Sequence, residues 1–423
     1  MGTYQHMQRT EEPWLGLVPD KWKPFRIKDI SQLSPALSGD KPEATELCTV
    51  VPMESVSENG QIDTSNLEDF DLISSGLTNF EVGDVIFAKI TPCMENGKGA
   101  YIGNLPSRYA FGSTEFHVLR PAHKVDGRFL YYYTYNSFYR GYAAVNMTGA
   151  AGQKRVSSRF LSNTRVYLPE FSQQSRIAAY LDKTCSAIDE TIETKRKQLE
   201  TLDALGKSII HRAVTRGLDD SVKLKESGVE FCRLVPSHWK RTKLRYEIYI
   251  RNGDFVSNKL NDNGEYPVIG GNGFMGRTDA FNVDKEVVVL GRVGAYCGNV
   301  HHLSQRSWVS DNALIVESIH NKKFLTYLFV ALDFNSVANK TAQPVITGTK
   351  IKNTYVLLPP SNEQSQIADY IAFENANLTA LKDNLNDQIA TLEQYRKSLI
   401  HECVTGNRRI TENDLKEIGV KLN

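Results

Sequence analysis

The sequence predicts an α/β (α+β) fold made of two copies of one plan, in which an α/β module is followed by a long helix. The first observation is a repeat at an offset of 190 residues, which begins at Gln174 and Gln364. The second is a repeat at an offset of 217 residues, which joins the openings of the two halves at Leu17 and Leu234. The two copies are therefore expected to share one fold.

Matching residues stand at both ends of each copy. Each half opens on the phrase Leu-Val-Pro-x-x-Trp, at 17–22 and at 234–239. Because the offset falls from 217 there to 190 in the helices, the first module is 27 residues longer than the second. The helix residues that recur are Gln174, Ser175, Ile177, Ala178 and Tyr180 with Gln364, Ser365, Ile367, Ala368 and Tyr370, then Lys207, Ser208, Ile210 and His211 with Lys397, Ser398, Ile400 and His401.

The stretch from Gln173 to Arg216 predicts a long helix because it lacks proline, has one interior glycine and is rich in Lys, Glu, Gln, Leu and Ala. The second copy of this helix carries leucines at seven-residue spacing. Such an apolar stripe needs a partner helix, and the first helix of the same chain is available for that pairing. Leu381 and Tyr395 are expected on the companion seam. The seam residues, to which we assign partner binding, are Ile188, Leu202, Ile209, Leu378, Leu385, Leu392 and Leu399.

Helix stop signals divide the chain into four parts. Gly217 and Gly406 follow the two helices, as a helix end favours. The expected parts are a first module at 1–168, a helix at 169–217, a second module at 218–358, and a helix with a tail at 359–423. Within the modules we expect a turn followed by a strand at Phe80–Ile90, with a related strand at Glu286–Val293. Further strands are expected at Glu115–Leu119 and Ala313–Val316, and helices at Gly127–Tyr142 and Lys322–Leu332.

The overall charge is close to balanced, with 50 Lys and Arg against 49 Asp and Glu. This excludes a uniformly basic nucleic-acid coat, although it permits a local basic cleft. The six cysteines form no CxxC pair and no Cys/His metal spacing, and no run approaches the roughly 20 apolar residues of a membrane span. We therefore expect a soluble cytoplasmic protein with reduced thiols that contacts no membrane.

Motifs for catalysis are weak. Gly271, Gly273 and Gly276 form a GxGxxG run, which binds a dinucleotide when it opens a helix. The residues that follow it, 277–284, lack helical periodicity, so no nucleotide is expected there. The sequence also carries no P-loop and no methyltransferase, nuclease or zinc-protease motif. The chain is therefore predicted to be no enzyme and to hold neither cofactor nor metal itself.

Two further groups favour packing over chemistry. His211 and His401 stand near the ends of the two helices, where an imidazole meets exposed carbonyls, so we favour capping or packing over catalysis. The aromatic run within 131–142 has the composition of a base-stacking platform. Burial preference favours a core or interface role for it instead.

Polar, glycine-flanked loops bring Arg, Lys, Gln, Asn, Ser and Thr together in each module. Such side chains recognise base edges through hydrogen bonds and hold phosphates by charge. In the first module the predicted DNA contacts are Lys89, Asn96, Lys98, Ser113, Thr114, Gln153, Lys154 and Arg155. In the second module they are Asn272, Arg277, Arg292, Asn312, Gln343, Thr347 and Lys350.

The order of these phrases resembles one family. Besides the two opening phrases, the chain carries P-x-x-x-Q/E-Q-S-x-I-A-x-Y at Pro169–Leu181 and Pro359–Ile371, with GSTEFHVLRP at 112–121, GRVGAYCGNV at 291–300 and SDNALIV at 310–316. Two variable modules in this setting are similar to the specificity (S) subunit of type I restriction-modification systems, the HsdS family. The resemblance covers nearly the whole chain.

The resemblance implies that each module is a target recognition domain for one half of a bipartite double-stranded DNA sequence. The repeated helices would pack as an antiparallel coiled coil with an internal pseudo-twofold, which separates the domains and docks two modification (M) subunits. Methylation by S-adenosylmethionine would belong to the M subunits. Translocation and cleavage with ATP and Mg would belong to restriction (R) subunits, which bind through the M subunits.

An antiparallel helix pair would let the symmetry of the protein match a bipartite target. About 43 helical residues at ~1.5 Å each give roughly 64 Å, enough to reach major grooves separated by about one helical turn or more. Because the two modules differ in length and in their loops, the target is expected to be asymmetric.

Two other classes of function stay open on the sequence. A coiled-coil scaffold whose modules bind protein would show DNA binding that depends little on salt or sequence. An enzyme that holds a nucleotide at Gly270–Gly276 would bind that cofactor as an isolated chain. Within the leading class, an S-like subunit of another methyltransferase-based defence system has the same features.

Overall fold

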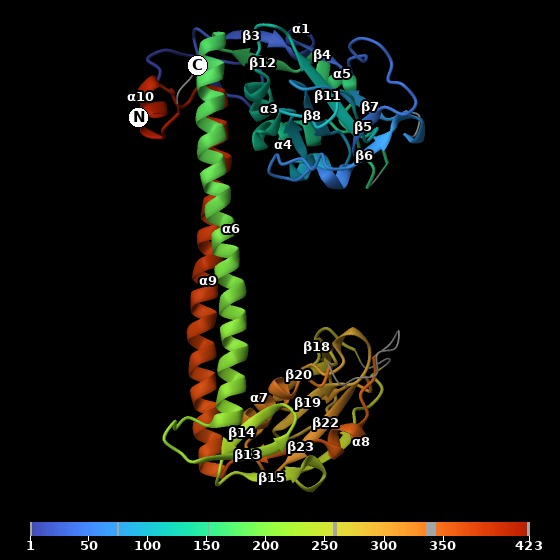
Figure 1. The fold of residues 1–423 in the computed structure, drawn as a ribbon, viewed down its shortest axis with the longest axis vertical. Helices are drawn as coiled ribbons and strands as arrows, with labels where there is room; N and C mark the ends of the chain where they lie inside the picture. Colours follow the sequence, from blue (N-terminus) through green and yellow to red (C-terminus); the bar gives the residue numbers. More distant parts are fainter. Residues whose placement is uncertain (1, 74–75, 151, 257–259, 336–343, 421–423) are drawn as a thin grey trace. The chain divides into compact units, whose positions relative to one another are not determined.

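The chain divides into two compact units, each with one α/β module and parts of both long helices (Figure 1). Unit 1 comprises Met1–Thr194 with Gln388–Asn423, and unit 2 comprises Lys195–Asp387. The long helices are α6 (Phe171–Arg216) and α9 (Ser361–Thr405). The computed structural model describes residues 2–73, 76–150, 152–256, 260–335 and 344–420.

The module of unit 1 contains two four-stranded sheets, with strand orders β6-β5-β10-β7 and β4-β11-β8-β9, and two short strand pairs, β1-β2 and β12-β3. Its strands are β1 (Met7–Arg9), β2 (Leu17–Pro19), β3 (Lys23–Arg26), β4 (Ser31–Leu33), β5 (Leu47–Val51), β6 (Leu67–Asp69), β7 (Thr78–Phe80), β8 (Val85–Ala88), β9 (Gly99–Tyr101), β10 (Ala110–Gly112), β11 (Phe116–Pro121) and β12 (Arg165–Leu168). Its shorter helices are α1 (Ile27–Ile30), α2 (Cys93–Asn96), α3 (Gly127–Tyr135), α4 (Ser137–Val145), α5 (Ser158–Asn163) and α10 (Glu412–Glu417).

Unit 2 repeats this plan with a four-stranded sheet, β16-β22-β19-β20, a three-stranded sheet, β18-β17-β21, and the pairs β13-β14 and β15-β23. Its strands are β13 (Leu224–Val229), β14 (Cys232–Pro236), β15 (Lys240–Lys243), β16 (Ile248–Asn252), β17 (Tyr266–Gly270), β18 (Gly273–Thr278), β19 (Val287–Gly291), β20 (Val300–Leu303), β21 (Trp308–Val309), β22 (Ala313–Ser318) and β23 (Tyr355–Leu358). Its shorter helices are α7 (Lys322–Leu332) and α8 (Gly348–Asn353).

The two modules share the pairing pattern of most of their strands. In each, one strand pairs with an antiparallel neighbour on one side and a parallel neighbour on the other: β5 between β6 and β10, and β17 between β18 and β21. Fifteen residues join β5 to β6, whereas two join β17 to β18. This connection accounts for about half of the extra length that the sequence places in the first module.

The central strands of the two modules are β8 and β19, and all their residues are buried. A continuous apolar run of this kind suits a strand that is covered on both faces. The strands expected at 80–90, 115–119, 286–293 and 313–316 are confirmed as β8, β11, β19 and β22, and the helix expected at 322–332 is confirmed as α7.

The helix expected at Gly127–Tyr142 is wrong in one respect, because two helices, α3 and α4, replace it. They break at Asn136, whose side-chain oxygen accepts the amide of Phe138 at 3.0 Å. An asparagine that caps the second helix in this way leaves the helical conformation itself. The aromatic side chains around the break are mostly buried, as expected for a core; the buried tyrosines are Tyr131, Tyr132, Tyr133 and Tyr139.

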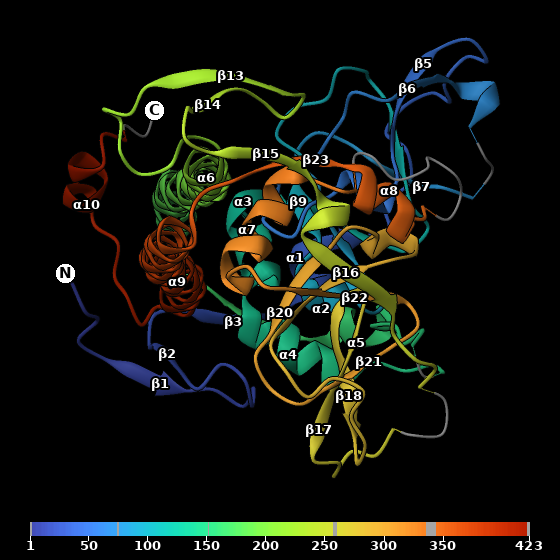
Figure 2. The ribbon, with the colours of Figure 1, turned by 90° about the horizontal axis from the view of Figure 1, so that it is seen from below.

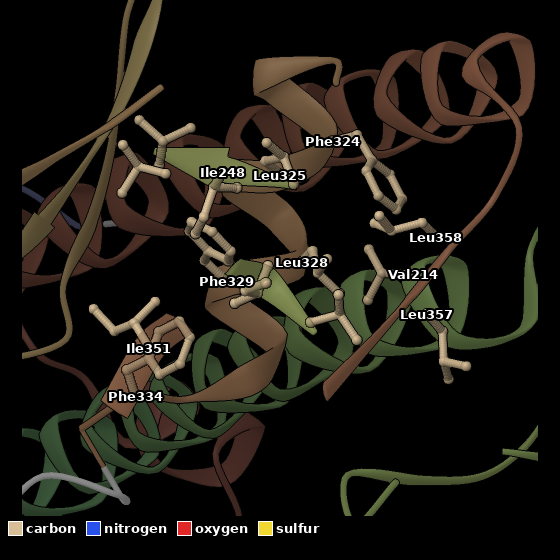
Figure 3. Close-up of a cluster of buried hydrophobic side chains, with 14 of the residues drawn as sticks. Val214, Ile248, Phe324, Leu325, Leu328, Phe329, Phe334, Ile351, Leu357 and Leu358 are labelled. Carbon is tan, nitrogen blue, oxygen red and sulfur yellow. The ribbon is translucent and has the colours of Figure 1, made fainter. Parts of the chain in front are cut away.

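The core of unit 2 forms where α7 packs against strands and the long helices (Figure 3). Phe324, Leu325 and Leu328 of α7 are almost fully buried. They lie among Val214 of α6 and Leu358 of β23, so the module and the helices share one hydrophobic core. The spacing of the three α7 residues puts them on one helical face, which explains why this helix faces inward.

The repeated opening phrase packs against the glycine at the end of a long helix. Gly217 and Gly406 have φ values of 73° and 75°, a conformation that glycine adopts without strain. A Cβ on Gly406 would lie 2.3 Å from Cδ of Pro19, and one on Gly217 would lie 3.4 Å from the ring of Trp239. Pro19 therefore leaves no room for a side chain at position 406, whereas a Cβ at position 217 would make an ordinary van der Waals contact with Trp239, and there the positive φ favours glycine.

A buried glutamine joins each module to the start of a long helix. Gln174 Oε1 accepts the amide of Asp126 at 3.0 Å, and its Nε2 donates to the carbonyl of Pro169 at 2.9 Å. Gln364 repeats both bonds, with the amide of Asn321 at 3.1 Å and the preceding proline carbonyl at 2.9 Å. Asp126 and Asn321 are the N-caps of α3 and α7, so each glutamine links a module helix to α6 or α9.

The long helices run antiparallel within each unit. In unit 1, Asp189 pairs with Arg396 at 3.0 Å, and the hydroxyl of Tyr180 accepts a hydrogen bond from Arg408, just beyond α9, at 2.9 Å. In unit 2, Asp203 pairs with Lys382. From residue 180 to residue 203 of α6, the numbers of the contacted residues fall from 408 to 382, as in an antiparallel pair. This agrees with the coiled-coil orientation that the family resemblance implies.

The leucine stripe of α9 forms the seam of this pairing. Its members are buried or half-buried, and so are the seam residues of α6; the full set is Ile188, Leu202, Ile209, Leu378, Leu385, Leu392 and Leu399. The companion positions were predicted wrongly, because Leu381 and Tyr395 are 54% and 46% exposed. Two paired helices cover only a narrow stripe, so apolar residues at its margin stay in solvent.

His117 of β11 supports the first module from within. It is 2% exposed, and its Nε2 lies 2.9 Å from the carbonyl of Val156, to which the ring donates. Burial lowers the pKa of His117 to about 4, and the bond to Val156 opposes that shift only in part. The histidine is therefore neutral at ordinary pH.

We predict that Gln174→Ala and Gln364→Ala each destabilise the protein by about 1–3 kcal/mol, because the amide of the N-cap residue loses its acceptor while buried. Gln394→Ala, an exposed position on α9, is the matched control and should change the free energy of unfolding by less than about 0.5 kcal/mol. Urea unfolding of the three variants measures this. Equal stability of Gln174→Ala and Gln394→Ala would contradict the assigned attachment.

We also predict a pH effect from His117. The folded-state pKa of His117, about 4, lies below the unfolded value of about 6.5. As pH falls below about 6.5, the unfolded chain therefore binds a proton at this histidine that the folded chain does not bind. The wild type should lose up to about 3 kcal/mol between pH 6.5 and pH 4 relative to His117→Gln. Urea unfolding of both proteins across this range is the measurement, and parallel pH profiles would refute the assignment.

Candidate nucleic-acid interface

In the first module, three predicted loops meet beyond the end of strand β8. Lys89 directly follows β8; its amide donates to the carbonyl of Glu115 at 2.8 Å, and its carbonyl accepts the amide of Val156 at 2.8 Å. The amide and the hydroxyl of Thr91 both donate to the carbonyl of Lys154, at 3.0 and 3.3 Å. Backbone hydrogen bonds therefore hold the loops together, which leaves the side chains available for other contacts.

An ion pair closes this cluster. Nη2 of Arg155 lies 2.7 Å from Oε1 of Glu115, and Nε lies 3.0 Å from Oε2. The hydrogen bond from Arg155 is the main cause that lowers the pKa of Glu115. Arg155 is thus engaged within the chain, whereas Gln153 and Lys154 beside it are exposed.

The other predicted residues of the first module divide into supports and exposed side chains. Lys98 donates its ammonium group to a backbone carbonyl at 3.0 Å, and Ser113 Oγ accepts the amide of Glu115 at 3.2 Å. Both of these side chains fix the local backbone. Asn96, at the end of α2, and Thr114 are exposed.

The second module builds the same arrangement beyond strand β19. Arg292 follows β19; its amide donates to the carbonyl of Asn312 at 2.9 Å, and its carbonyl accepts the amide of Ile346 at 3.0 Å. Val293 and Val345 form a bridge there, as the equivalent residues do in the first module. Lys89 and Arg292 therefore occupy equivalent positions, so each module presents one cation at the end of its central strand.

Asn272 joins this second cluster from the turn between β17 and β18. The turn lies against the loops of Arg292 and Asn312, because a Cβ on Gly271 would be 3.4 Å from the carbonyl of Asn312 and 3.5 Å from Cα of Gly291. Asn272 and Asn312 are both exposed. The structure thus brings Asn272, Arg292 and Asn312 into one region.

The remaining predicted residues of the second module have local roles or lie elsewhere. Nε and Nη2 of Arg277 donate to two backbone carbonyls of the preceding loop, each at 2.6 Å. Thr347 caps α8 by accepting the amide of Lys350 at 3.3 Å. Gln343 lies outside the described residues.

The equivalent positions of the two clusters carry different chemistry. Where the first module has Glu115 and Arg155, the second has Asn312 and Val345. Sequence reasoning identified most of these residues from their composition, but it missed the ion-pair partner Glu115 and the buried support His117. A single glutamate or histidine carries no pattern that would mark either role.

The GxGxxG run, at which no nucleotide was expected, belongs to the β17–β18 hairpin. Gly271 lies in the turn, and Gly273 and Gly276 lie in β18. No helix begins there, so the backbone amides that would bind a pyrophosphate are paired in a strand ladder. The two repeated histidines pack, as favoured: His401 stacks on Phe138 with ring centroids 4.1 Å apart, and His211 Nε2 lies 3.1 Å from the carbonyl of Phe231.

Among the residues that the structure describes, no helix has an apolar stretch suited to crossing a membrane. In the same residues, His, Cys, Asp and Glu side chains form no group of three or more that could hold a metal ion.

Exposed apolar side chains accompany the long helices. In unit 2 they include Leu205 of α6 and Phe373 and Leu381 of α9, which are 46%, 63% and 54% exposed. The seam residues to which the sequence assigns partner binding are instead buried or half-buried in the helix pair. They stabilise that pair, and the exposed residues form the accessible surface beside it.

The sequence matches the family described as the type I restriction modification DNA specificity domain, over residues 19–201 and 236–391. The specificity subunit of the Escherichia coli type I restriction enzyme EcoAI is 28% identical over 220 residues, which cover 51% of this chain and 36% of that subunit. The chain thus spans only about a third of that relative. The putative type I restriction enzyme MjaX specificity subunit of Methanocaldococcus jannaschii is 22% identical over 431 residues, 96% of this chain and 97% of that subunit.

Solved structures share the fold. A chain from work on complex assembly and conformational transition of the type I R-M system superposes with a TM-score of 0.75 and 18% identity, covering 92% of this chain and 99% of that one. The HsdS subunit from Thermoanaerobacter tengcongensis has a TM-score of 0.54 and 18% identity, covering 92% and 98%.

The matched family is defined by DNA specificity rather than by methylation or cleavage, in agreement with the prediction that this chain is not itself an enzyme. Its match includes most of both modules and most of both long helices. The chain therefore belongs to the type I restriction-modification DNA specificity family.

Proposed function

We propose that this chain is the DNA sequence-specificity subunit of a type I restriction-modification complex. Each module is a target recognition domain that binds one half-site of a bipartite double-stranded DNA target. The functional domains follow the sequence division: recognition domains at 1–168 and 218–358, the first helix at 169–217, and the second helix with its tail at 359–423. The length of the paired helices sets the spacer between the half-sites.

One observation carries the proposal: the two modules hold equivalent loop clusters by the same backbone bonds but with different side chains. Lys89 and Arg292 supply a cation at the same position, suited to a phosphate or to a guanine edge. The first cluster has Glu115 and Arg155 where the second has Asn312 and Val345, so the two clusters differ in hydrogen-bonding capacity. A target whose two half-sites differ in sequence follows from this difference.

The partners follow from the same reasoning. Two modification (M) subunits dock beside the helix pair, where apolar side chains are exposed, and restriction (R) subunits bind through them. The M subunits hold S-adenosylmethionine, and ATP and Mg belong to the R subunits. The complex works in the cytoplasm, where its DNA target lies.

The equivalent cations provide a matched test of half-site assignment. We predict that Lys89→Ala weakens recognition of the first half-site alone, and that Arg292→Ala weakens recognition of the second alone, each by about 5- to 150-fold in affinity. The measurement is single-molecule methylome sequencing of a host that expresses each variant with its methyltransferase, together with Kd values for duplexes altered in one half-site. Equal loss at both half-sites from either variant would show a general phosphate contact instead.

The exposed helix surface provides a test of docking. We predict that Phe373→Asp with Leu381→Asp abolishes copurification of the M subunit, because a charge on an apolar contact surface is desolvated without a partner. Thr379→Asp is the control, since helical spacing puts that exposed residue on the other flank of α9. Unchanged copurification of the double variant would move the M subunit to another surface.

A further inference from the structure

The β17–β18 hairpin of unit 2 holds apolar side chains in solvent beside the second loop cluster. Phe274 is 65% exposed, Met275 is 47% exposed and Tyr296 is 48% exposed. Single exposed apolar residues are ordinary on protein surfaces, but a group of them marks an interaction site. Met275 and Tyr296 lie close to the turn, because a Cβ on Gly270 would lie 2.2 Å from Sδ of Met275 and one on Gly271 would lie 3.9 Å from Cβ of Tyr296. Phe274 is the second residue of β18, directly after the same turn.

The hairpin has the shape of a two-stranded ribbon. Among the strands that the structure describes, β18 lies at the edge of its sheet and pairs only with β17, in an antiparallel ladder joined by the turn at Gly271 and Asn272. It extends to the side of unit 2 that lies away from the long helices (Figure 2). A ribbon of this kind fits the major groove of B-DNA, which admits a helix or two β-strands.

The ribbon is braced at its base. Arg277 ties β18 to the loop before β17 through its two hydrogen bonds of 2.6 Å. Val268 and Ile269 of β17 pair in parallel with β21 on the other side. Phe274 is therefore presented by a supported element, so little order has to be gained when a ligand binds.

The equivalent connection in unit 1 is engaged within the chain. There the residues between β5 and β6 are anchored, because Tyr135 donates its hydroxyl to the carbonyl of Glu58 at 2.7 Å and Arg396 donates to the carbonyl of Asn59 at 3.2 Å. The turn between β17 and β18 of unit 2 has only two residues and forms no equivalent loop. Its tip instead stands beside the cation Arg292 and the amides of Asn272 and Asn312, which complement the charge and base edges of DNA.

We propose that the β17–β18 hairpin enters the major groove of the second half-site, where the ring of Phe274 contacts the 5-methyl group of a thymine. Thymine is the base that offers an apolar group in that groove, and an aromatic side chain is a suitable partner for it. Asn272, two residues away at the turn, hydrogen-bonds a neighbouring base edge. This inference rests on the proposed function and names the base chemistry that this hairpin selects.

The test uses the assembled complex of this chain with its methyltransferase subunits and duplexes that carry the mapped target. Each thymine of the second half-site is replaced in turn by deoxyuridine, which removes only the methyl group. The wild type should lose about fourfold in affinity at one position, the effect of one buried methyl-sized group. Phe274→Ala should bind the thymine duplex about fourfold more weakly than the wild type and should be insensitive to deoxyuridine at that position.

Two variants control the experiment. Ile319→Ala removes an apolar side chain that is 92% exposed elsewhere in the same unit, and it should keep the full wild-type response to deoxyuridine. Phe274→Leu keeps an apolar contact and should keep part of that response. Matching thermal unfolding of the variants shows that folding is not the cause.

An equal response to deoxyuridine in the wild type and Phe274→Ala would overturn the inference, and so would a second half-site without thymine in either strand. Failure of the proposed function looks different, because the wild-type complex would then show no sequence preference at either half-site. Sensitivity to deoxyuridine that disappears only in Phe274→Ala supports both proposals together.

Discussion

The architecture depends on one buried side-chain amide in each half. Gln174 and Gln364 each accept a hydrogen bond from the N-cap residue of a module helix and donate one to the proline carbonyl at the start of a long helix. A buried amide satisfied on both sides fixes direction as well as contact, which an apolar residue cannot do. Packing of the proline and tryptophan phrase on the terminal glycines gives each module a second attachment, at the end of the opposite helix.

The long-range plan of the fold could be predicted from the sequence because repetition reports it directly. Two long helices can be predicted from matched residues, terminal glycines and leucine spacing without any knowledge of tertiary contacts. The break at Asn136 could not be found in this way, since a cap depends on where one side chain points. The exposure of Leu381 and Tyr395 was missed for a related reason: spacing predicts which residues share a stripe, but not how wide the partner's cover is.

The loop residues show the same division. Composition identified the stretches that meet, because they are rich in side chains that hydrogen-bond to bases and phosphates. Composition could not separate Lys154, which is exposed, from Arg155, which is paired with Glu115. Phe274 was passed over because an isolated phenylalanine predicts core, and only its exposure in the hairpin shows that it is not a core residue. The two units also differ where the repeat is imperfect: Arg396, which anchors the first module, stands where the first helix has Gly206.

The backbone bonds around Lys89 and Arg292 have a consequence for how such a protein changes over generations. Because amides and carbonyls hold the loops, the side chains at these positions carry little of the stability of the fold. Glu115 of the first module is equivalent to Asn312 of the second, and Arg155 to Val345. The backbone bonds are the same in both modules despite these differences. Single substitutions in one loop cluster can therefore change its surface chemistry while its own backbone frame and the other cluster persist, so the two clusters can diverge independently of each other.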